Sequence, residues 1–195
     1  IDSGYRDEIG VIIDNIEPED VFKYFREICS IPHGSDNTEM ISEYCVEFAK
    51  KHNLKYRKDE CGNVIIWKKA SKGYEDRPGV ILQGHIDMVA VKNSGCDKNL
   101  EKDGLDLAVD GDWLYAKETS LGGDDGIAVA YALAILASDE YKHPSLEAIF
   151  TVGEEIGMVG ASAIDLSDIN GRILMNMDSE DEGIFLAGCA GGATV

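Results

Sequence analysis

Side chains that can bind a metal ion or transfer a proton follow three apolar segments of the sequence. These segments are VILQGHIDMV (80–89) with His85 and Asp87, AIFTVGEE (148–155) with Glu154 and Glu155, and ILMNMD (173–178) with Asp178. In open α/β sheets, functional groups gather outside the carboxyl ends of the strands, so we expect the three segments to meet at one site. Imidazole and carboxylate donors together are typical of a zinc-type hydrolytic centre.

His85 lies inside an apolar run as Gly-His-Ile-Asp. In an extended strand, residues 85 and 87 point to the same side, so the Asp87 carboxylate can hold the imidazole in one tautomer. Metal-binding histidines usually have such a partner. A histidine in a strand is more often a core or surface residue, but the neighbouring Asp87 and the position at a strand end favour a metal ligand.

Glu154 and Glu155 follow a strand as two adjacent carboxylates, which face different directions. One can bind a metal ion while the other takes a proton from water, as metal-assisted hydrolysis requires. An isolated Glu-Glu pair after a strand would be interpreted as a charged turn, and so would Asp178. Three such endings in one chain argue against that interpretation.

A fourth acidic site lies in SLGGDDG, where Asp124 and Asp125 precede a long apolar stretch. The glycines allow the backbone to approach an ion closely, and aspartates also cap helices well. We assign the ligand role to Asp124 and expect a capping aspartate beside it. The spacing does not fit a calcium EF-hand loop, which needs alternating acidic positions and a distal glutamate.

The other histidines and the cysteine near the end of the sequence are expected to be structural. His33 in SIPHGS is interpreted as a turn residue that could also face the site, and His52 ends a predicted helix. His143 precedes a strand and therefore lies at the opposite end of the sheet. Cys189 in GCAGG has no neighbouring base and is expected to be a small buried residue. No Gly-x-Ser-x-Gly motif is present, which removes the main support for a serine hydrolase.

Hydrophobic periodicity predicts helices and strands in alternation. The predicted helices cover residues 18–30, 38–53, 126–138 and 161–166, and a hairpin is predicted around Cys61 and Gly62 before the three apolar strands. Residues 92–118 are polar and rich in turn residues, with a plain turn at DGDW, and are expected to be a surface excursion beside the substrate. The alternation indicates one layered α/β domain.

The composition excludes some partners. Asp and Glu number 37 against 18 Lys and Arg, a formal charge of -19 that repels nucleic acid and anionic membrane surfaces. No apolar run is long enough to cross a bilayer. The five cysteines include no CxxC pair, which favours a reducing, cytoplasmic location over a disulfide framework.

Several long segments resemble the M20 metallopeptidase family, most closely its aminoacyl-histidine dipeptidase branch. They are ICSIPHGS, DECGNVIIWK, VILQGHIDMVAVKN, TSLGGDDGIAVAYALAIL, TVGEEIGMVGA, ILMNMDSEDEG and GCAGG. With the resemblance we expect a three-layer α/β/α catalytic domain with a mixed, largely parallel sheet. It also implies that the full-length parent is a homodimer formed through a separate lid or dimerisation domain.

The resemblance further implies a role for each site residue. Two divalent metal ions, usually zinc but with manganese or cobalt possible, would be bridged by Asp124 and a water molecule. His85 and Asp178 would bind one ion and Glu155 the other. Glu154 would act as the general base and Asp87 would orient His85, so that Asp87 and Glu154 are the catalytic pair beside four metal ligands.

In this family a further histidine, far downstream and beyond the lid, completes the second metal site. The sequence stops at Val195, about where the lid would begin. We therefore expect residues 1–188 to be the amino-terminal part of the catalytic domain and 189–195 to start the connection to the lid. Alone, this part should bind metal weakly and have little activity.

The expected function of the full-length parent is metal-dependent hydrolysis of dipeptides, Xaa-His and related ones, with a small peptide as substrate. One alternative is an M20-type deacylase or aminopeptidase that acts on N-acyl amino acids or short peptides. Another is a non-catalytic metal-binding domain. Glu154 argues against the last, because a protein that only binds metal needs no base beside its ligands.

Overall fold

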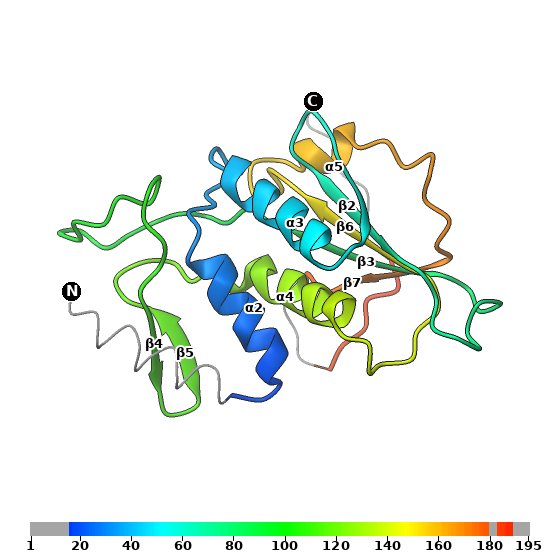
Figure 1. Cartoon of the computed structure of the whole chain (residues 1–195). Helices are drawn as coiled ribbons and strands as arrows, with labels where there is room; N and C mark the ends of the chain where they lie inside the picture. Colours follow the sequence, from blue (N-terminus) through cyan, green and yellow to red (C-terminus); the bar gives the residue numbers. More distant parts are fainter. Residues whose placement is uncertain (1–15, 180–182, 189–195) are drawn as a thin grey trace.

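A five-stranded sheet with helices packed on it forms the centre of the computed structural model, which describes residues 16–179 and 183–188 (Figure 1). The helices are α2 (Glu19–Cys29), α3 (Glu39–Lys51), α4 (Gly123–Ala137) and α5 (Val159–Ala163). The strands are β1 (Lys55–Lys58), β2 (Val64–Lys68), β3 (Val80–His85), β4 (Leu107–Asp110), β5 (Trp113–Ala116), β6 (Leu146–Thr151) and β7 (Ile173–Asn176).

The sheet has the strand order β1-β2-β6-β3-β7 and is mixed, as expected. Strand β3 pairs in parallel with β6 on one side and with β7 on the other, so that His85 stands opposite Thr151 and Gln83 opposite Asn176. The β1–β2 hairpin adds antiparallel strands beside β6. The carboxyl ends of β3, β6 and β7 therefore lie along one edge, which confirms that the three apolar segments end together.

Helices α2, α3 and α4 cover one face of the sheet (Figure 1). Helix α4 is apolar nearly all round and packs between α2 and β3, with Leu133 and Leu136 fully buried. Gly126 allows this contact, since a Cβ there would lie 3.2 Å from the Phe25 ring. Burial of these aliphatic and aromatic side chains is the main stabilising contribution to the fold, and it fixes the start of α4 against β3.

In the described part of the chain, fewer residues pack on the opposite face of the sheet. Ile65, Ile81 and Ile149 form a small buried cluster under Ile164 and Ile169, which follow α5. The α/β/α order of layers is thus represented here by three helices on one face and by α5 and its following segment on the other. All four residues of the edge strand β7 are exposed.

Two segments differ from the pattern-based expectation. The excursion between residues 92 and 118 contains the β4–β5 hairpin, whose turn is at DGDW and which docks near α2 through a hydrogen bond from Leu105 N–H to the Cys29 carbonyl (2.7 Å). Helix α5 runs from Val159 to Ala163 rather than from 161 to 166. Cys189 and segment 189–195 lie outside the described residues. No helix in the described part of the chain is long and apolar enough to span a membrane.

Candidate metal centre

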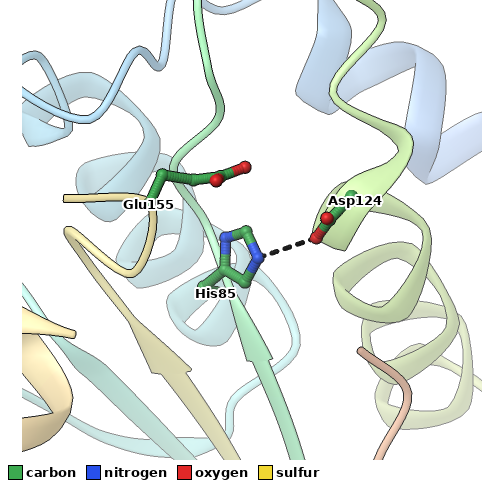
Figure 2. Close-up of side chains that lie close together, drawn as sticks. All are labelled: His85, Asp124 and Glu155. Atoms are coloured by element: carbon green, nitrogen blue, oxygen red, sulfur yellow. Dashed lines mark hydrogen bonds and ion pairs between the residues drawn. The ribbon is translucent and has the colours of Figure 1, made fainter. Parts of the chain in front are cut away.

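Three side chains from separate elements converge at the carboxyl edge of the sheet (Figure 2). His85 ends β3, Asp124 lies at the start of α4, and Glu155 follows β6. His85 Nε2 is 2.9 Å from Asp124 Oδ1, and one ligand atom from each of the three residues lies within 4.8 Å of the other two. His85 is buried, whereas the two carboxylates are accessible to solvent. This arrangement offers one nitrogen and two oxygen donors to a cation.

The tautomer of His85 is determined by a backbone carbonyl. His85 Nδ1 lies 3.0 Å from the carbonyl oxygen of Asp87 and 3.5 Å from Asp87 Oδ1. A carbonyl oxygen only accepts hydrogen bonds, so Nδ1 carries the proton and donates it. Nε2 is then directed toward Asp124, as a metal-binding imidazole requires. The expected contact with the Asp87 carboxylate exists, but the contact of Nδ1 with the Asp87 backbone carbonyl is shorter.

The Asp87 carboxylate has a second set of contacts that the sequence did not indicate. It is buried and accepts hydrogen bonds from the backbone N–H groups of Glu154 (3.0 Å) and Glu155 (3.3 Å). Burial alone would raise the pKa of Asp87, but the hydrogen bonds with His85 and Glu154 outweigh it and lower the pKa to about 2. Asp87 is therefore an ionised link between the end of β3 and the loop after β6.

Glu154 lies beside the three converging side chains, with its Oε2 3.9 Å from His85 Nε2. Burial raises the pKa of Glu154; the His85 charge opposes this rise, while the negative charges of Asp178 and Glu155 add to it. Asp178 is close enough to act on Glu154 electrostatically, but it is not one of the three residues whose ligand atoms converge. Strand β7 ends at Asn176, two residues before it.

Asp124 and Asp125 do not cap α4, which corrects the expectation of a capping aspartate. The N-cap is Gly122, with φ of 68°, and it has no side-chain cap hydrogen bond. Both aspartates have non-helical backbone angles, and their shared peptide bond is cis. Their carboxylates contact His85 at the end of β3 instead. Asp124 lies against the imidazole, and Asp125 is buried and accepts the His85 backbone N–H (3.3 Å). A Cβ at Gly84 would lie 2.8 Å from Asp125 Oδ2, so this approach needs the glycine.

The electrostatic environment of His85 favours positive charge. Burial disfavours the imidazolium and would lower the pKa of His85. Hydrogen bonds with Asp87 and Asp124 and the nearby negative charge of Asp125 outweigh burial and raise this pKa to about 10. Burial in turn raises the pKa of Asp125 to about 7. Surroundings that attract a proton so strongly also attract a divalent cation, and a donor set of imidazole and carboxylates suits zinc, manganese or cobalt. The residues present therefore fit a metal ion.

The remaining histidines are not among the three converging side chains, although His33 lies near them, with its Nε2 3.3 Å from where a Cβ on Gly122 would stand. His33 is buried in a turn, where Nδ1 lies 2.6 Å from the Ile31 carbonyl oxygen. His52 follows α3 and packs on the Phe48 ring at 4.5 Å between centroids. His143 lies before β6, at the opposite end of the strand from Glu154.

Comparison with known proteins gave related peptidases, although no family model matches the chain. The chain is 41% identical over 180 residues to the cytosol non-specific dipeptidase of Escherichia coli K12, and the match covers 92% of this chain. It superposes on the crystal structure of aminoacylhistidine dipeptidase from Vibrio alginolyticus with a TM-score of 0.85, at 43% identity and over 88% of this chain. A tripeptidase from Staphylococcus aureus, 21% identical with a TM-score of 0.71 over 85% of this chain and 44% of its own, shares the fold.

The chain spans 37% of the length of the Escherichia coli relative and 35% of the Vibrio alginolyticus chain. The matched part includes the edge of the sheet where His85, Asp124 and Glu155 meet. The agreement in sequence and in fold supports the resemblance to the M20 metallopeptidase family and its aminoacylhistidine dipeptidase branch.

Proposed function

We propose that this chain is part of a metal-dependent dipeptidase that hydrolyses Xaa-His and related dipeptides. The observation that carries the proposal is the convergence of His85, Asp124 and Glu155 within 4.8 Å, with Glu154 3.9 Å from His85. The 41% identity to a dipeptidase points to the same activity. Ligands from three elements together with an adjacent base are what metal-assisted hydrolysis requires.

The proposed ligands are distributed over two divalent ions, with zinc as the expected metal. His85 and Asp178 would hold one ion, Glu155 the other, and Asp124 would lie between them. Divalent ions bound there would polarise the scissile carbonyl and lower the pKa of a bound water molecule. Asp124 suits the shared position because its carboxylate is 71% exposed and has two oxygens to offer.

Glu154 is the proposed general base, which takes a proton from water and returns it to the leaving amine. A base works best when its pKa lies near the operating pH, and the pKa of Glu154 is raised by burial and by neighbouring carboxylates. Its backbone N–H is held by the Asp87 carboxylate at 3.0 Å, which limits movement of the residue. Asp87 thus supports both the first metal ligand and the base.

The rest of the proposal concerns the whole protein. Residues 1–188 would be the amino-terminal part of the catalytic domain, and residues 189–195 would lead into a lid through which the parent dimerises. Alone, this part would have little activity, because Glu155 would lack its partner ligand. A cytosolic location accords with the name of the Escherichia coli relative.

The test is a Glu154→Gln variant of the full-length parent, assayed with zinc, manganese or cobalt on dipeptides and on N-acyl amino acids. Loss of a general base should reduce kcat by about 10²–10⁴-fold. Glu140→Gln, an exposed change in the segment between α4 and β6, is the matched control and should leave turnover unchanged. Unaltered turnover in Glu154→Gln would contradict the mechanism.

The same assays separate the alternatives. Faster turnover of N-acyl amino acids than of dipeptides would make the protein a deacylase, and metal binding without any turnover would make it a binding domain. Chelator-sensitive turnover by the 195-residue chain alone would refute the need for a further part.

A further inference from the structure

The loop that follows β6 carries both glutamates of the proposed centre and is closed at its base by two backbone hydrogen bonds. Val159 N–H donates to the Gly153 carbonyl (3.0 Å), and Gly160 N–H donates to the Val152 carbonyl (2.9 Å). Asp87 holds the residues just inside this base through the N–H groups of Glu154 and Glu155. Residues 152–160 are therefore a small loop whose position depends on what holds its base.

The side chain of Asn63, far away in the sequence, spans that base. Its Oδ1 accepts the N–H of Val152 (3.1 Å), and its Nδ2 donates to the carbonyl of Gly160 (3.0 Å). One amide group thus binds the first and the last residue of the loop. Asn63 is 1% exposed, so water does not compete for these hydrogen bonds.

Asp59 fixes the orientation of the Asn63 amide. Asp59 Oδ2 accepts the second Nδ2 hydrogen of Asn63 (2.7 Å), while Oδ1 accepts the backbone N–H groups of Asn63 (3.0 Å) and Cys61 (2.9 Å). Both amide hydrogens and the amide oxygen of Asn63 are then used. A flipped amide would place its oxygen against the Gly160 carbonyl and the Asp59 carboxylate, which would repel it.

We propose that Asn63, held by Asp59, is a positioning residue that fixes the loop bearing Glu154 and Glu155 for catalysis. This inference rests on the proposed function, in which Glu155 is a metal ligand and Glu154 is the base. Asn63 touches neither of them directly and acts through the loop. Asn63 acts on the two ends of the loop, and Asp87 acts on Glu154 and Glu155 inside it. Misplacement of a catalytic group by about 1 Å can cost about 100-fold in rate, so a loosened loop base should matter for turnover.

The test compares Asn63→Ala and Asn63→Asp with Ile65→Ala. Ile65 is also buried in the same hairpin but packs in the cluster on the other face, so its variant lowers stability without touching the loop. In the 195-residue chain, hydrogen–deuterium exchange of segment 152–160 should accelerate about tenfold in both Asn63 variants. Asn63→Ala removes both hydrogen bonds to the loop, and Asn63→Asp replaces the Nδ2 donor to the Gly160 carbonyl by an oxygen that repels it. Zinc titration should show affinity weaker by about 10–100-fold, as when groups that orient ligands are removed.

In the full-length parent, the Asn63 variants should lower kcat by about 100-fold with little change in KM, which a general loss of stability would not produce. The proposal would be overturned if the Asn63 variants changed the exchange rate of segment 152–160 and the zinc affinity no more than Ile65→Ala does. If the Asn63 variants do not fold, Asp59→Asn takes their place. It should give a smaller change in the same direction, and unchanged exchange would again refute the proposal.

The two proposals fail in different ways. A wild-type parent that hydrolyses no dipeptide would refute the proposed function, while exchange of the loop would still decide the role of Asn63. A working dipeptidase whose loop exchange does not respond to Asn63 would refute only the positioning role.

Discussion

Replacement of Asp87 by asparagine tests how the two halves of the candidate centre are joined. The Asp87 carboxylate is buried, and its oxygens accept the backbone N–H groups of Glu154 (3.0 Å) and Glu155 (3.3 Å). The asparagine side chain has nearly the same shape but one oxygen instead of two. One of the two N–H groups would then face an amide NH₂ group and lose its acceptor.

The expected loss of stability follows from these two contacts. The N–H that keeps an oxygen acceptor exchanges a charge-assisted hydrogen bond for a neutral one, a loss of about 1 kcal/mol. The N–H that loses its acceptor is left unsatisfied in a buried position, which costs about 1–3 kcal/mol. Asp87→Asn should therefore reduce the free energy of unfolding by about 2–4 kcal/mol, a large part of the total for a typical domain.

Denaturant unfolding at neutral pH, in the presence of a chelator, measures this difference without any contribution from metal binding. Asp112→Asn, an exposed change in the β4–β5 turn, is the matched control and should alter the free energy of unfolding by less than about 0.5 kcal/mol. If the effect of Asp87→Asn were as small as that of this control, Asp87 would not be the link between β3 and the loop.

Three further perturbations test the electrostatics, the packing and the ligand set of the same region. In chelated protein, the pKa of His85 rises from 6.5 to about 10 on folding, so its stabilising contribution is complete below pH 6.5 and is lost as the pH rises toward 10. Denaturant titrations across this range should show the decline, and its persistence in His85→Asn would contradict the assignment. Gly160→Ala would force a Cβ against the Asn63 side chain and should cost about 1–3 kcal/mol in unfolding free energy; Gly188→Ala, with no neighbouring atom within 4 Å, is its control. Added zinc should raise the thermal unfolding midpoint of the wild type more than that of Glu155→Gln, which lacks one donor, and equal shifts would exclude Glu155 as a ligand.

Much of the secondary structure could be predicted because its signals are local. The apolar periodicity after Pro18 and after Thr38 predicted α2 and α3 to within a few residues of their observed ends. The β4–β5 hairpin was not predicted, because its strands have four residues each and Trp113 is 79% exposed, which leaves little hydrophobic pattern. Helix α5 was displaced in the prediction because left-handed residues before it, at Gly157 and Met158, set its start.

The sequence by itself determined which residues could form the centre and that they would share one edge, because strands that run in parallel end on the same side of a sheet. Only the tertiary structure decided how they are connected. The Asp87 carboxylate supports a loop 67 residues away, Asp125 binds the main chain of β3 instead of capping α4, and Asn63 spans the base of the glutamate loop. These contacts depend on the distance between backbone groups that are remote in sequence, and no local spacing of residue types encodes that distance.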